Sequence, residues 1–435
     1  MPPSIAIATP VLGGPGTMRA RRPPPPRCVE QQQGAGTQYR LVLTMVGSPR
    51  PRMLATTLAL LATVSESALT LPSPANMSFT AASTLQNIFY DQTTGLWGCN
   101  QLGAAKHDIG WWNCGNSLTA LTQYTKFAND STFKADIANT FEVNKGATAI
   151  LCAVDMSTDD RAWWSLAWMD TYDVLGTPEA LDRAKCYFNA EAKLWDTKCG
   201  GGVWWNAKRT YKNAITNELF AYQACRLTQY GPNDTYRDWC LRAFPWFVGS
   251  GMINAQGLVN DGLNGPFPNG ECVNNNQTTW SYNQGVVLAA AASYFQVTGN
   301  ASAIELAIVI ADATAQRLTF APEGVLRESC DASFSCDSSQ QQFKGIFMRS
   351  LAILVNEVLS TPAAPEEWAA HARRYSKWIA TNVESVWTEA RTPDNQFAVS
   401  WEGPPQASTA TPLTSAFDLF NANLLVNKLT AGVGV

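Results

Sequence analysis

The stretch WWSLAWMDTYDVLGTPEALDRAKCYFNAEAKLW, residues Trp163–Trp195, contains two helical patterns separated by a stop signal. In both halves apolar residues recur at spacings of three and four, which is the period of an amphipathic helix. Between them, Gly176 is suited to end the first helix and Pro178 is suited to begin the second. The stretch therefore predicts a helical hairpin.

Similar stop signals recur along the chain. Helices are predicted to end at Gly176, Gly231, Gly299 and Thr361, which lie 55 to 68 residues apart, and each interval holds two helical patterns. From about residue 79 onward this rhythm gives about twelve helices in six hairpins, which suits a closed helical toroid. An open superhelical array is the alternative, but it would need more uniform repeats and capping units. We therefore predict an all-α fold, a toroid of six helical hairpins.

Long segments rich in polar and aromatic residues precede alternate helices, whereas the turns between the other helices are short. These segments are GWWNCGN, STDDRAWW, GGGVWWNAKRTYKNAITNE, NDGLNG…TTWSYNQG and CDSSQQQFKG. If alternate helices form an inner ring, all of these segments gather at one mouth of the toroid. Functional residues concentrate in such clustered loops, so the mouth is the predicted site.

The composition narrows the possible functions. The chain has 435 residues, of which 46% are hydrophobic, so it can bury a large core. Only 15% of residues are charged and the net charge is −4, which argues against nucleic acid as a partner. The 16 tryptophans exceed what a core needs, and their flat apolar faces suit stacking on sugar rings.

The N-terminal part has the pattern of a targeting sequence. Residues 1–44 form a low-complexity extension, and residues 45–68 have the layout of a secretory signal peptide, with an apolar run too short to span a bilayer. We interpret Met45 or Met53 as the true initiator and the extension as a gene-model artefact; a genuine disordered arm is the alternative. Residues 69–435 are then expected to form a single catalytic domain.

Other features are typical of an extracellular protein. Sequons for N-glycosylation occur at Asn76, Asn129, Asn233, Asn276 and Asn300. The C-terminal residues lack the apolar stretch of a lipid-anchor signal. We expect a monomer that is secreted, extracellular or associated with the cell wall, with no transmembrane segment.

The cysteines favour disulfides over a metal site. Eleven are present, and Cys28 lies in the extension, which leaves an even number. Cys330 and Cys336 are close enough in sequence to be the predicted local pair. With two histidines and no Cys-x-x-Cys motif, a zinc site is not expected, and we predict no metal and no cofactor.

The segment STDDRAWW, residues 157–164, has two interpretations. In the first, Ser157 or Thr158 caps a helix, Ser157 and Asp160 are spaced roughly like a capping box, and the helix dipole favours acids in the first turn. In the second, Asp159 and Asp160 are a catalytic pair, because two adjacent acids repel each other and one would suffice as a cap. Each aspartate lies one helical turn from a tryptophan, and an apolar wall can raise the pKa of one acid while its neighbour stays ionised.

Adjacent helical residues hold their carboxyl groups roughly 5–6 Å apart, near the separation of about 5–5.5 Å expected for retaining glycosidases. A glycosidase built on this pair is therefore predicted to retain the anomeric configuration. A Ser-His-Asp site is disfavoured, since it would need His107 or His371. We interpret His107 as a structural loop residue and His371 as a surface or interhelix residue.

The ordered set DDRAWW, YDVLG, GGGVWWN, KNAITNELF, NDG and WSYNQG closely resembles glycoside hydrolase family 76, the fungal and bacterial endo-α-1,6-mannanases. The resemblance runs from about residue 79 to residue 428. It implies an (α/α)6 barrel and retaining hydrolysis of internal α-1,6-mannosidic bonds of mannan. It also implies that Asp159 is the nucleophile and Asp160 the general acid/base.

Further mouth residues are candidates for binding the sugar: Trp112, Asn113, Trp163, Trp164, Trp204, Trp205, Lys212, Asn213, Asn217, Asp261, Trp280, Tyr282 and Asn283. Glu218 belongs with the polar group that begins with Lys212. For each of them a structural role is the alternative, whether burial against the barrel, interhelix hydrogen bonding or turn formation.

The expected partner is α-1,6-mannan or a mannosylated cell-wall glycan. Two other functions remain open. One is a cell-wall transglycosidase, in which a sugar hydroxyl rather than water resolves the same covalent intermediate. The other is a mannan-binding barrel without turnover, against which the intact aspartate pair argues.

Overall fold

The computed structural model describes residues 71–98, 109–151, 157–232, 234–265, 267, 269–321 and 324–432, which all belong to one compact unit. Twelve α-helices lie in this described part: α1 Pro74–Phe89, α2 Trp111–Ala128, α3 Lys134–Leu151, α4 Thr158–Leu175, α5 Pro178–Ala192, α6 Ala214–Leu227, α7 Asp234–Gly249, α8 Ser281–Thr298, α9 Ala301–Arg317, α10 Phe343–Ser360, α11 Glu366–Glu389 and α12 Ala410–Gly432. The described β-structure consists of isolated bridges between loops.

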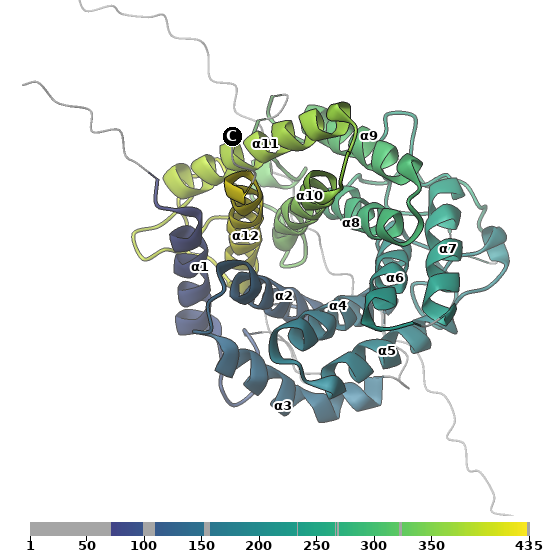
Figure 1. The fold of residues 1–435 in the computed structure, drawn as a ribbon, viewed down its shortest axis with the longest axis horizontal. Coiled ribbons are helices and arrows are strands. Elements are labelled where there is room, and N and C mark those ends of the chain that lie inside the picture. Colours follow the sequence, from purple (N-terminus) through teal and green to yellow (C-terminus); the bar gives the residue numbers. More distant parts are fainter. Residues whose placement is uncertain are drawn as a thin grey trace, which may run out of the picture. The chain divides into compact units, whose positions relative to one another are not determined.

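The helices form two concentric rings. Figure 1 shows α2, α4, α6, α8, α10 and α12 in the inner ring and the odd-numbered helices around them. Neighbouring inner helices contact one another in order, and the ring closes where α12 packs against α2, with α1 also packed on α12. The protein is therefore an (α/α)6 barrel. The prediction of a closed toroid is confirmed, and the alternative of an open superhelical array is excluded.

The two rings differ in which residues they bury. The outer helix α11 buries one face, including Trp368, Ala372, Tyr375 and Trp378 at spacings of three and four. The inner helix α8 buries nearly every residue from Ser281 to Tyr294. A helix covered on all sides needs apolar or small residues around its whole circumference. The core therefore lies between the rings and along the inner helices.

Most predicted stops are helix ends. Gly176 and Gly299 adopt left-handed backbone at the C-termini of α4 and α8, each with φ of 69°, and their N–H groups donate to the helix carbonyls of Tyr172 and Phe295. Thr361 follows α10 directly. Gly231 follows a short 3-10 helix that continues α6, so this stop lies later than the end of the α-helix itself.

Glycines allow the inner helices to approach closely. A Cβ on Gly285 of α8 would lie 2.6 Å from the Cα of Phe347 in α10. A Cβ on Gly345 of α10 would lie 2.5 Å from the carbonyl oxygen of Ser415 in α12. These are backbone contacts, so no other residue fits there without moving a helix.

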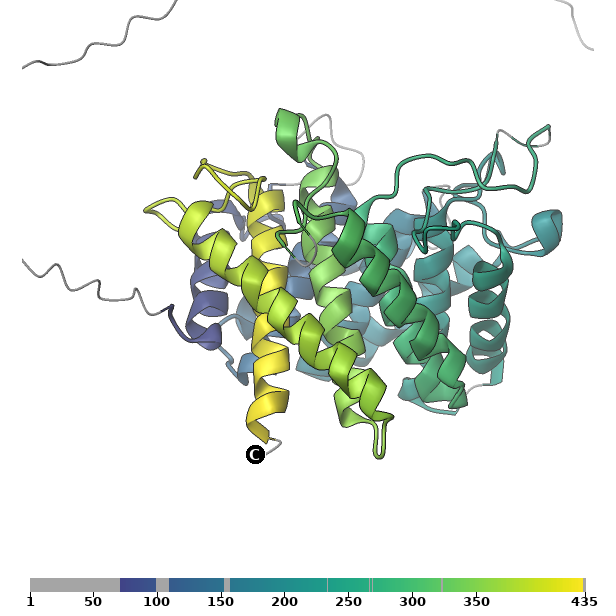
Figure 2. The ribbon, with the colours of Figure 1, turned by 90° about the horizontal axis from the view of Figure 1, so that it is seen from above.

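The long segments before the inner helices lie at one end of the barrel, as predicted. Figure 2 shows the loops that precede α8, α10 and α12 together at the upper end, while the lower end carries the shorter turns that follow the inner helices. We call the upper end, where the inner helices begin, the mouth.

The described cysteines are oxidised. Disulfides join Cys199 to Cys272, Cys225 to Cys240 and Cys330 to Cys336, which confirms the predicted local pair. Cys114 and Cys186 are disulfide-bonded as well.

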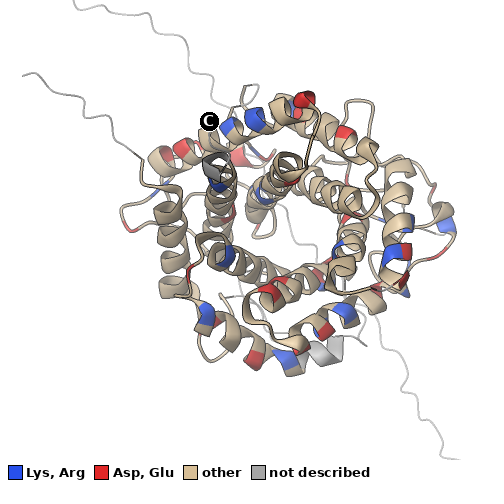
Figure 3. Ribbon diagram, in the orientation of Figure 1, with Lys and Arg blue, Asp and Glu red and all other residues tan. Residues whose placement is uncertain are grey.

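The described surface carries charges of both signs, and Figure 3 shows them intermixed around the outer helices. Among the described helices, none is both long and apolar enough to cross a membrane. Four sequon asparagines are exposed: Asn76, Asn129, Asn276 and Asn300. The predicted extension and signal peptide, together with His107 and Asn233, lie outside the described residues.

Candidate active site

The aspartate pair lies in the first turn of α4, at the mouth. Ser157 occupies the position before the helix, but its side chain makes no capping hydrogen bond, so the predicted capping box is wrong. Instead, Thr158 fixes the helix start to the loop before α6. Its N–H donates to the carbonyl of Trp205 at 2.7 Å, and its hydroxyl donates to the carbonyl of Trp204 at 2.8 Å.

The two aspartates have different surroundings. Asp159 Oδ1 accepts hydrogen bonds from Trp205 Nε1 at 3.0 Å and from the backbone N–H of Asp160 at 3.2 Å. Burial raises the pKa of Asp159, but these hydrogen bonds oppose the rise. Burial and then the negative charge of Asp159 raise the pKa of Asp160. The arrangement therefore favours an ionised Asp159 beside a protonated Asp160.

Aromatic side chains from four inner helices form a continuous cluster at the mouth. Trp163 of α4 stacks on Trp112 of α2 with ring centroids 5.7 Å apart. Trp112 contacts Phe343 of α10, which stacks on Tyr282 of α8 at 3.8 Å and meets Trp280 at 5.6 Å. Trp112, Trp280 and Tyr282 are partly exposed, whereas Trp163 and Phe343 are largely buried. This cluster can present aromatic surface to a sugar.

Acidic groups surround Tyr282. Burial, and then the negative charges of Asp261, Asp159 and Glu218, raise the pKa of its hydroxyl well above the usual range. Glu218 is fully buried, and within the described structure neither of its carboxylate oxygens has a hydrogen-bond partner. Burial raises the pKa of Glu218 well above its usual range. The structure thus brings Asp159, Glu218 and Asp261 together around one tyrosine.

Asp261 is held by a neighbour that the sequence analysis missed. The Tyr211 hydroxyl donates to Asp261 Oδ2 at 2.5 Å and accepts from Asn275 Nδ2 at 2.9 Å. Burial raises the pKa of Asp261, and the hydrogen bond from Tyr211 opposes this. Tyr211 and Phe343 both lie within the mouth segments picked out in the sequence, but nothing local distinguished them from their neighbours.

Three of the candidate tryptophans are buried, and two of these, Trp164 and Trp204, also have their indole N–H groups bonded inside the protein. Trp164 is fully buried, and its ring stacks on that of Trp111 with centroids 4.9 Å apart. Its Nε1 donates to the carbonyl of Trp111 at 3.0 Å. Trp204 is 3% exposed and donates from Nε1 to Asp196. Their neighbour Trp205 is 37% exposed. The rings of Trp164 and Trp204 are occupied by packing, which favours the structural alternative for both, and their contact with substrate stays a prediction.

Five polar candidates are buried: Asn113, Lys212, Asn213, Asn217 and Asn283. Asn113 is fully buried between Gly110 and Gln342. Asn217 holds both backbone groups of Val203. The side-chain groups of Asn113 and Asn217 are already used inside the protein, which favours the structural alternative, and their contact with substrate stays a prediction.

Lys212 is fully buried in an ion pair with Asp196, which again favours the structural alternative, and its contact with sugar stays a prediction. Asn213 precedes α6 and is 6% exposed. Asn283 is fully buried, and its amide has no partner among the described residues. His371 lies on α11 with Nδ1 3.5 Å from Asp312 of α9, which confirms its interhelix position.

Comparison with known proteins gives relatives over most of the described chain. A family model described as glycosyl hydrolase family 76 matches residues 73–431. The mannan endo-1,6-alpha-mannosidase DCW1 of Candida albicans is 30% identical over 278 residues, which cover 59% of this chain and 61% of that protein. The DCW1 protein of Saccharomyces cerevisiae is 28% identical over 275 residues, covering 59% and 60%. The chain spans about three fifths of the length of these curated relatives.

Solved structures show the same fold. An inactive variant of the alpha-1,6-mannanase GH76A of Salegentibacter sp. HEL1_6, in complex with alpha-1,6-mannotetrose, has a TM-score of 0.71 at 18% identity and covers 82% of this chain and 100% of that one. Dfg5 of Chaetomium thermophilum, in complex with glucosamine, has a TM-score of 0.67 at 20% identity, covering 81% and 89%.

Proposed function

Because the chain belongs to glycosyl hydrolase family 76, we propose that it hydrolyses internal α-1,6-mannosidic bonds of mannan with retention of configuration. The observation that carries the proposal is the Asp159–Asp160 pair, which lies at the mouth in the first turn of an inner helix. The names of the curated relatives support mannan as the substrate.

The proposed reaction has two steps. In the first, Asp159 attacks the anomeric carbon while Asp160 protonates the departing glycosidic oxygen, giving a covalent mannosyl-enzyme and a shortened chain. In the second, Asp160 takes a proton from water, and the resulting hydroxide displaces Asp159 from the anomeric carbon. Two inversions at the same carbon restore the α configuration.

The local electrostatics suit this exchange of roles. Before the reaction, the negative charge of Asp159 raises the pKa of Asp160 and keeps its proton in place. When Asp159 becomes an ester it loses that charge, so the pKa of Asp160 falls and Asp160 can act as the base. The Trp205 N–H bond to Asp159 Oδ1 holds the nucleophile ionised and oriented.

The partly exposed residues of the mouth are the proposed sugar contacts. Trp112, Trp205, Trp280 and Tyr282 offer aromatic surface for stacking, and Asp261 offers a carboxylate to sugar hydroxyls. We also propose that residues 69–435 act as one catalytic domain outside the cell, as a monomer on cell-wall mannan. The match over residues 73–431 and the oxidised cysteines support this proposal.

The test uses the full-length chain expressed in a secreting host and incubated with linear α-1,6-mannan. We expect short products of α configuration, followed by chromatography and NMR. Asp159→Asn and Asp160→Asn should abolish them, while Asp182→Asn, an exposed aspartate on α5, should leave them unchanged. Undiminished mannan binding without any release would indicate a binding barrel. Products longer than the substrate would indicate a transglycosidase.

Azide then assigns the two roles. With an aryl α-1,6-mannobioside, whose leaving group needs no acid, azide can replace the missing carboxylate. Asp160→Asn should give the α-glycosyl azide, because the covalent intermediate still forms. Asp159→Asn should give the β-glycosyl azide by direct displacement. The reverse outcome would exchange the roles of the two aspartates.

A further inference from the structure

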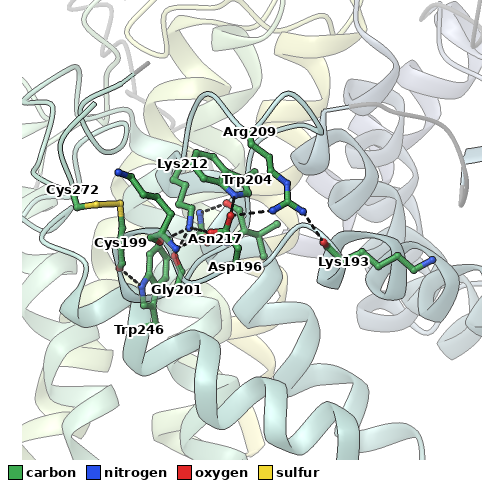
Figure 4. Close-up of polar contacts among 12 residues, drawn as sticks. Lys193, Asp196, Cys199, Gly201, Trp204, Arg209, Lys212, Asn217, Trp246 and Cys272 are labelled. Atoms are coloured by element: carbon green, nitrogen blue, oxygen red, sulfur yellow. Dashed lines mark hydrogen bonds and ion pairs between the residues drawn. A yellow bond between two sulfur atoms is a disulfide. The ribbon is translucent and has the colours of Figure 1, made fainter. Parts of the chain in front are cut away.

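Lys212 is the centre of a buried polar hub beneath the mouth. Its side chain is fully buried, and Nζ donates to Asp196 Oδ1 at 2.9 Å, to the carbonyl of Lys198 at 2.6 Å and to that of Gly201 at 2.5 Å (Figure 4). Nζ also lies 4.5 Å from the centroid of the Trp204 ring. All three ammonium protons are therefore used inside the protein.

The hub fixes Trp204 from two directions. Lys212 covers the face of the ring, and Asp196 Oδ2 accepts from its Nε1 at 2.6 Å. The same carboxylate oxygen accepts from the half-exposed Arg209 at 3.1 Å (Figure 4). Cation–π contact and charge-assisted hydrogen bonding both strengthen when water is excluded. The position of Trp204 is therefore set by a fully buried ammonium on the face of its ring and by a partly exposed carboxylate at its N–H.

From Trp204 a continuous path leads to the catalytic pair. The carbonyls of Trp204 and Trp205 accept the hydroxyl and the N–H of Thr158, the first residue of α4. The indole N–H of Trp205 donates to Asp159 Oδ1 at 3.0 Å. Every link between Lys212 and Asp159 is thus a packed or hydrogen-bonded contact.

We propose that Lys212 is a positioning residue for the hydrolysis: it holds the Trp204–Trp205 segment so that the Trp205 indole aligns the carboxylate of Asp159. The inference rests on the proposed function above. Other restraints act on the same loop, because Cys199 is bonded to Cys272 and Asn217 holds Val203. The backbone N–H groups of Trp204 and Trp205 donate to the carbonyls of Leu194 and Tyr211, and Phe267 packs edge-on against the Trp204 ring at 5.3 Å. The hub adds the charged contacts to the Trp204 ring and its indole N–H, and these are the contacts that the experiment removes.

A second buried lysine provides a matched comparison. Lys344 of α10 is 1% exposed and donates to Asp331 and to the carbonyl of Val399. Asp331 Oδ2 accepts from the N–H of Glu328, whose carboxylate holds Ser281 at the start of α8. Lys344 therefore ties a mouth loop to α8 as Lys212 ties one to α4. Its loss should cost comparable stability without acting on Trp205.

The experiment compares three variants of the full chain with the wild type: Lys212→Met, Lys344→Met and Lys208→Gln. Values of kcat and KM on linear α-1,6-mannan are measured across pH, and hydrogen exchange is followed by mass spectrometry in peptides that begin α4. For Lys212→Met we expect kcat to fall roughly 10- to 100-fold with little change in KM, because misplacement of a reacting group by about 1 Å has that effect. Lys208→Gln should behave as wild type, because this exposed side chain of the same loop lies outside the hub.

Two readouts distinguish positioning from a purely structural role. Loss of the Trp205 hydrogen bond removes an interaction that favours ionised Asp159, so the acid limb of the kcat/KM profile should move to higher pH in Lys212→Met and in Trp205→Phe. The Thr158 amide should also exchange faster in Lys212→Met. Lys344→Met should show neither change.

The other groups that act on this pair are the same in all variants. Asp160 and Arg161 lie on α4, Glu191 lies on α5 and Tyr282 lies on α8. A shift of the acid limb therefore reports the Trp205 contact.

The inference would be overturned if folded Lys212→Met had the same kcat as the wild type and the acid limb of its kcat/KM profile lay at the same pH. If that variant does not fold, Asp196→Asn and Trp205→Phe provide the test, and an unmoved limb in Trp205→Phe overturns the inference. If the wild type releases nothing from mannan, the proposed function has failed. In that case faster exchange at Thr158 in Lys212→Met still supports the positioning role, and unchanged exchange refutes it.

Discussion

The closeness of the inner helices predicts a substitution that should disrupt the barrel. Gly285 faces α10, and a Cβ there would lie 2.6 Å from the Cα of Phe347 and 3.3 Å from the carbonyl oxygen of Ile346. These are backbone atoms, so no rotamer change relieves the contact. In Gly285→Ala, α8 and α10 must move apart, and the closed ring transmits that movement to their neighbours.

The sign of the effect follows from two opposing terms. Alanine stabilises a helix interior by about 1 kcal/mol relative to glycine. Overpacking of a close-packed core costs about 1–3 kcal/mol, and a contact between two backbones belongs at the upper end of that range. We therefore expect Gly285→Ala to lower the free energy of unfolding by about 2 kcal/mol. Activity should fall too, because Tyr282, one turn earlier, stacks on Phe343 at 3.8 Å.

The assay is urea unfolding under non-reducing conditions, followed by tryptophan fluorescence. Gly146→Ala in α3 is the matched control, because a Cβ there would meet nothing within 4 Å. It should raise the free energy of unfolding by up to about 1 kcal/mol. The reasoning is refuted if Gly285→Ala is as stable as the wild type, or if the two substitutions have the same effect.

Three further outcomes are expected. The plot of kcat/KM against pH should be bell-shaped, with both limbs above the usual pKa range of aspartate, because burial raises the pKa of both proposed catalytic carboxyls. Activity should fall at low pH as the nucleophile is protonated and at high pH as the acid ionises. An acid limb at about pH 4 would contradict this prediction. Trp164→Phe should remove a buried hydrogen bond and part of the packing against Trp111, and so lower the free energy of unfolding by about 1–3 kcal/mol. KM for mannan should be unchanged because the ring is fully buried, and a raised KM would indicate that Trp164 contacts the substrate. Replacing both Cys199 and Cys272 by serine should lower the free energy of unfolding by about 2–4 kcal/mol, and an unchanged urea midpoint would show that the disulfide adds nothing to the loop.

The architecture could be predicted because its signals are local. Helical periodicity and the left-handed glycines at positions 176 and 299 act within one or two turns, so they mark the hairpins without knowledge of the tertiary structure. The Cys330–Cys336 pair was predictable for the same reason, since its residues are six apart. The Cys199–Cys272 pair spans 73 positions, and nothing local specifies it.

The orientation of individual side chains at the mouth could not be predicted. Trp204 and Trp205 are neighbours in one loop, yet the first is 3% exposed and the second 37% exposed. Their different orientations depend on Asp196 and Lys212, which meet only in the folded chain. Phe343 was missed because its contacts come from α2 and α8, far away in sequence.

Because the ring of helices is closed, the structure of the mouth should not depend on which helix comes first along the chain. Because α1 packs on α12 and α12 on α2, the contacts across this seam resemble those between hairpins adjacent in sequence. Both ends of the barrel helices lie on the side away from the mouth, since α1 leads toward the mouth and α12 leads away from it. A circular permutant that joins residues 432 and 74 through a short linker and opens at the Gly176–Pro178 turn would interrupt none of the mouth loops. We expect it to fold to the same barrel with the same proposed catalytic pair, because the arrangement of the helices in space, rather than their order along the chain, places these two aspartates at the mouth.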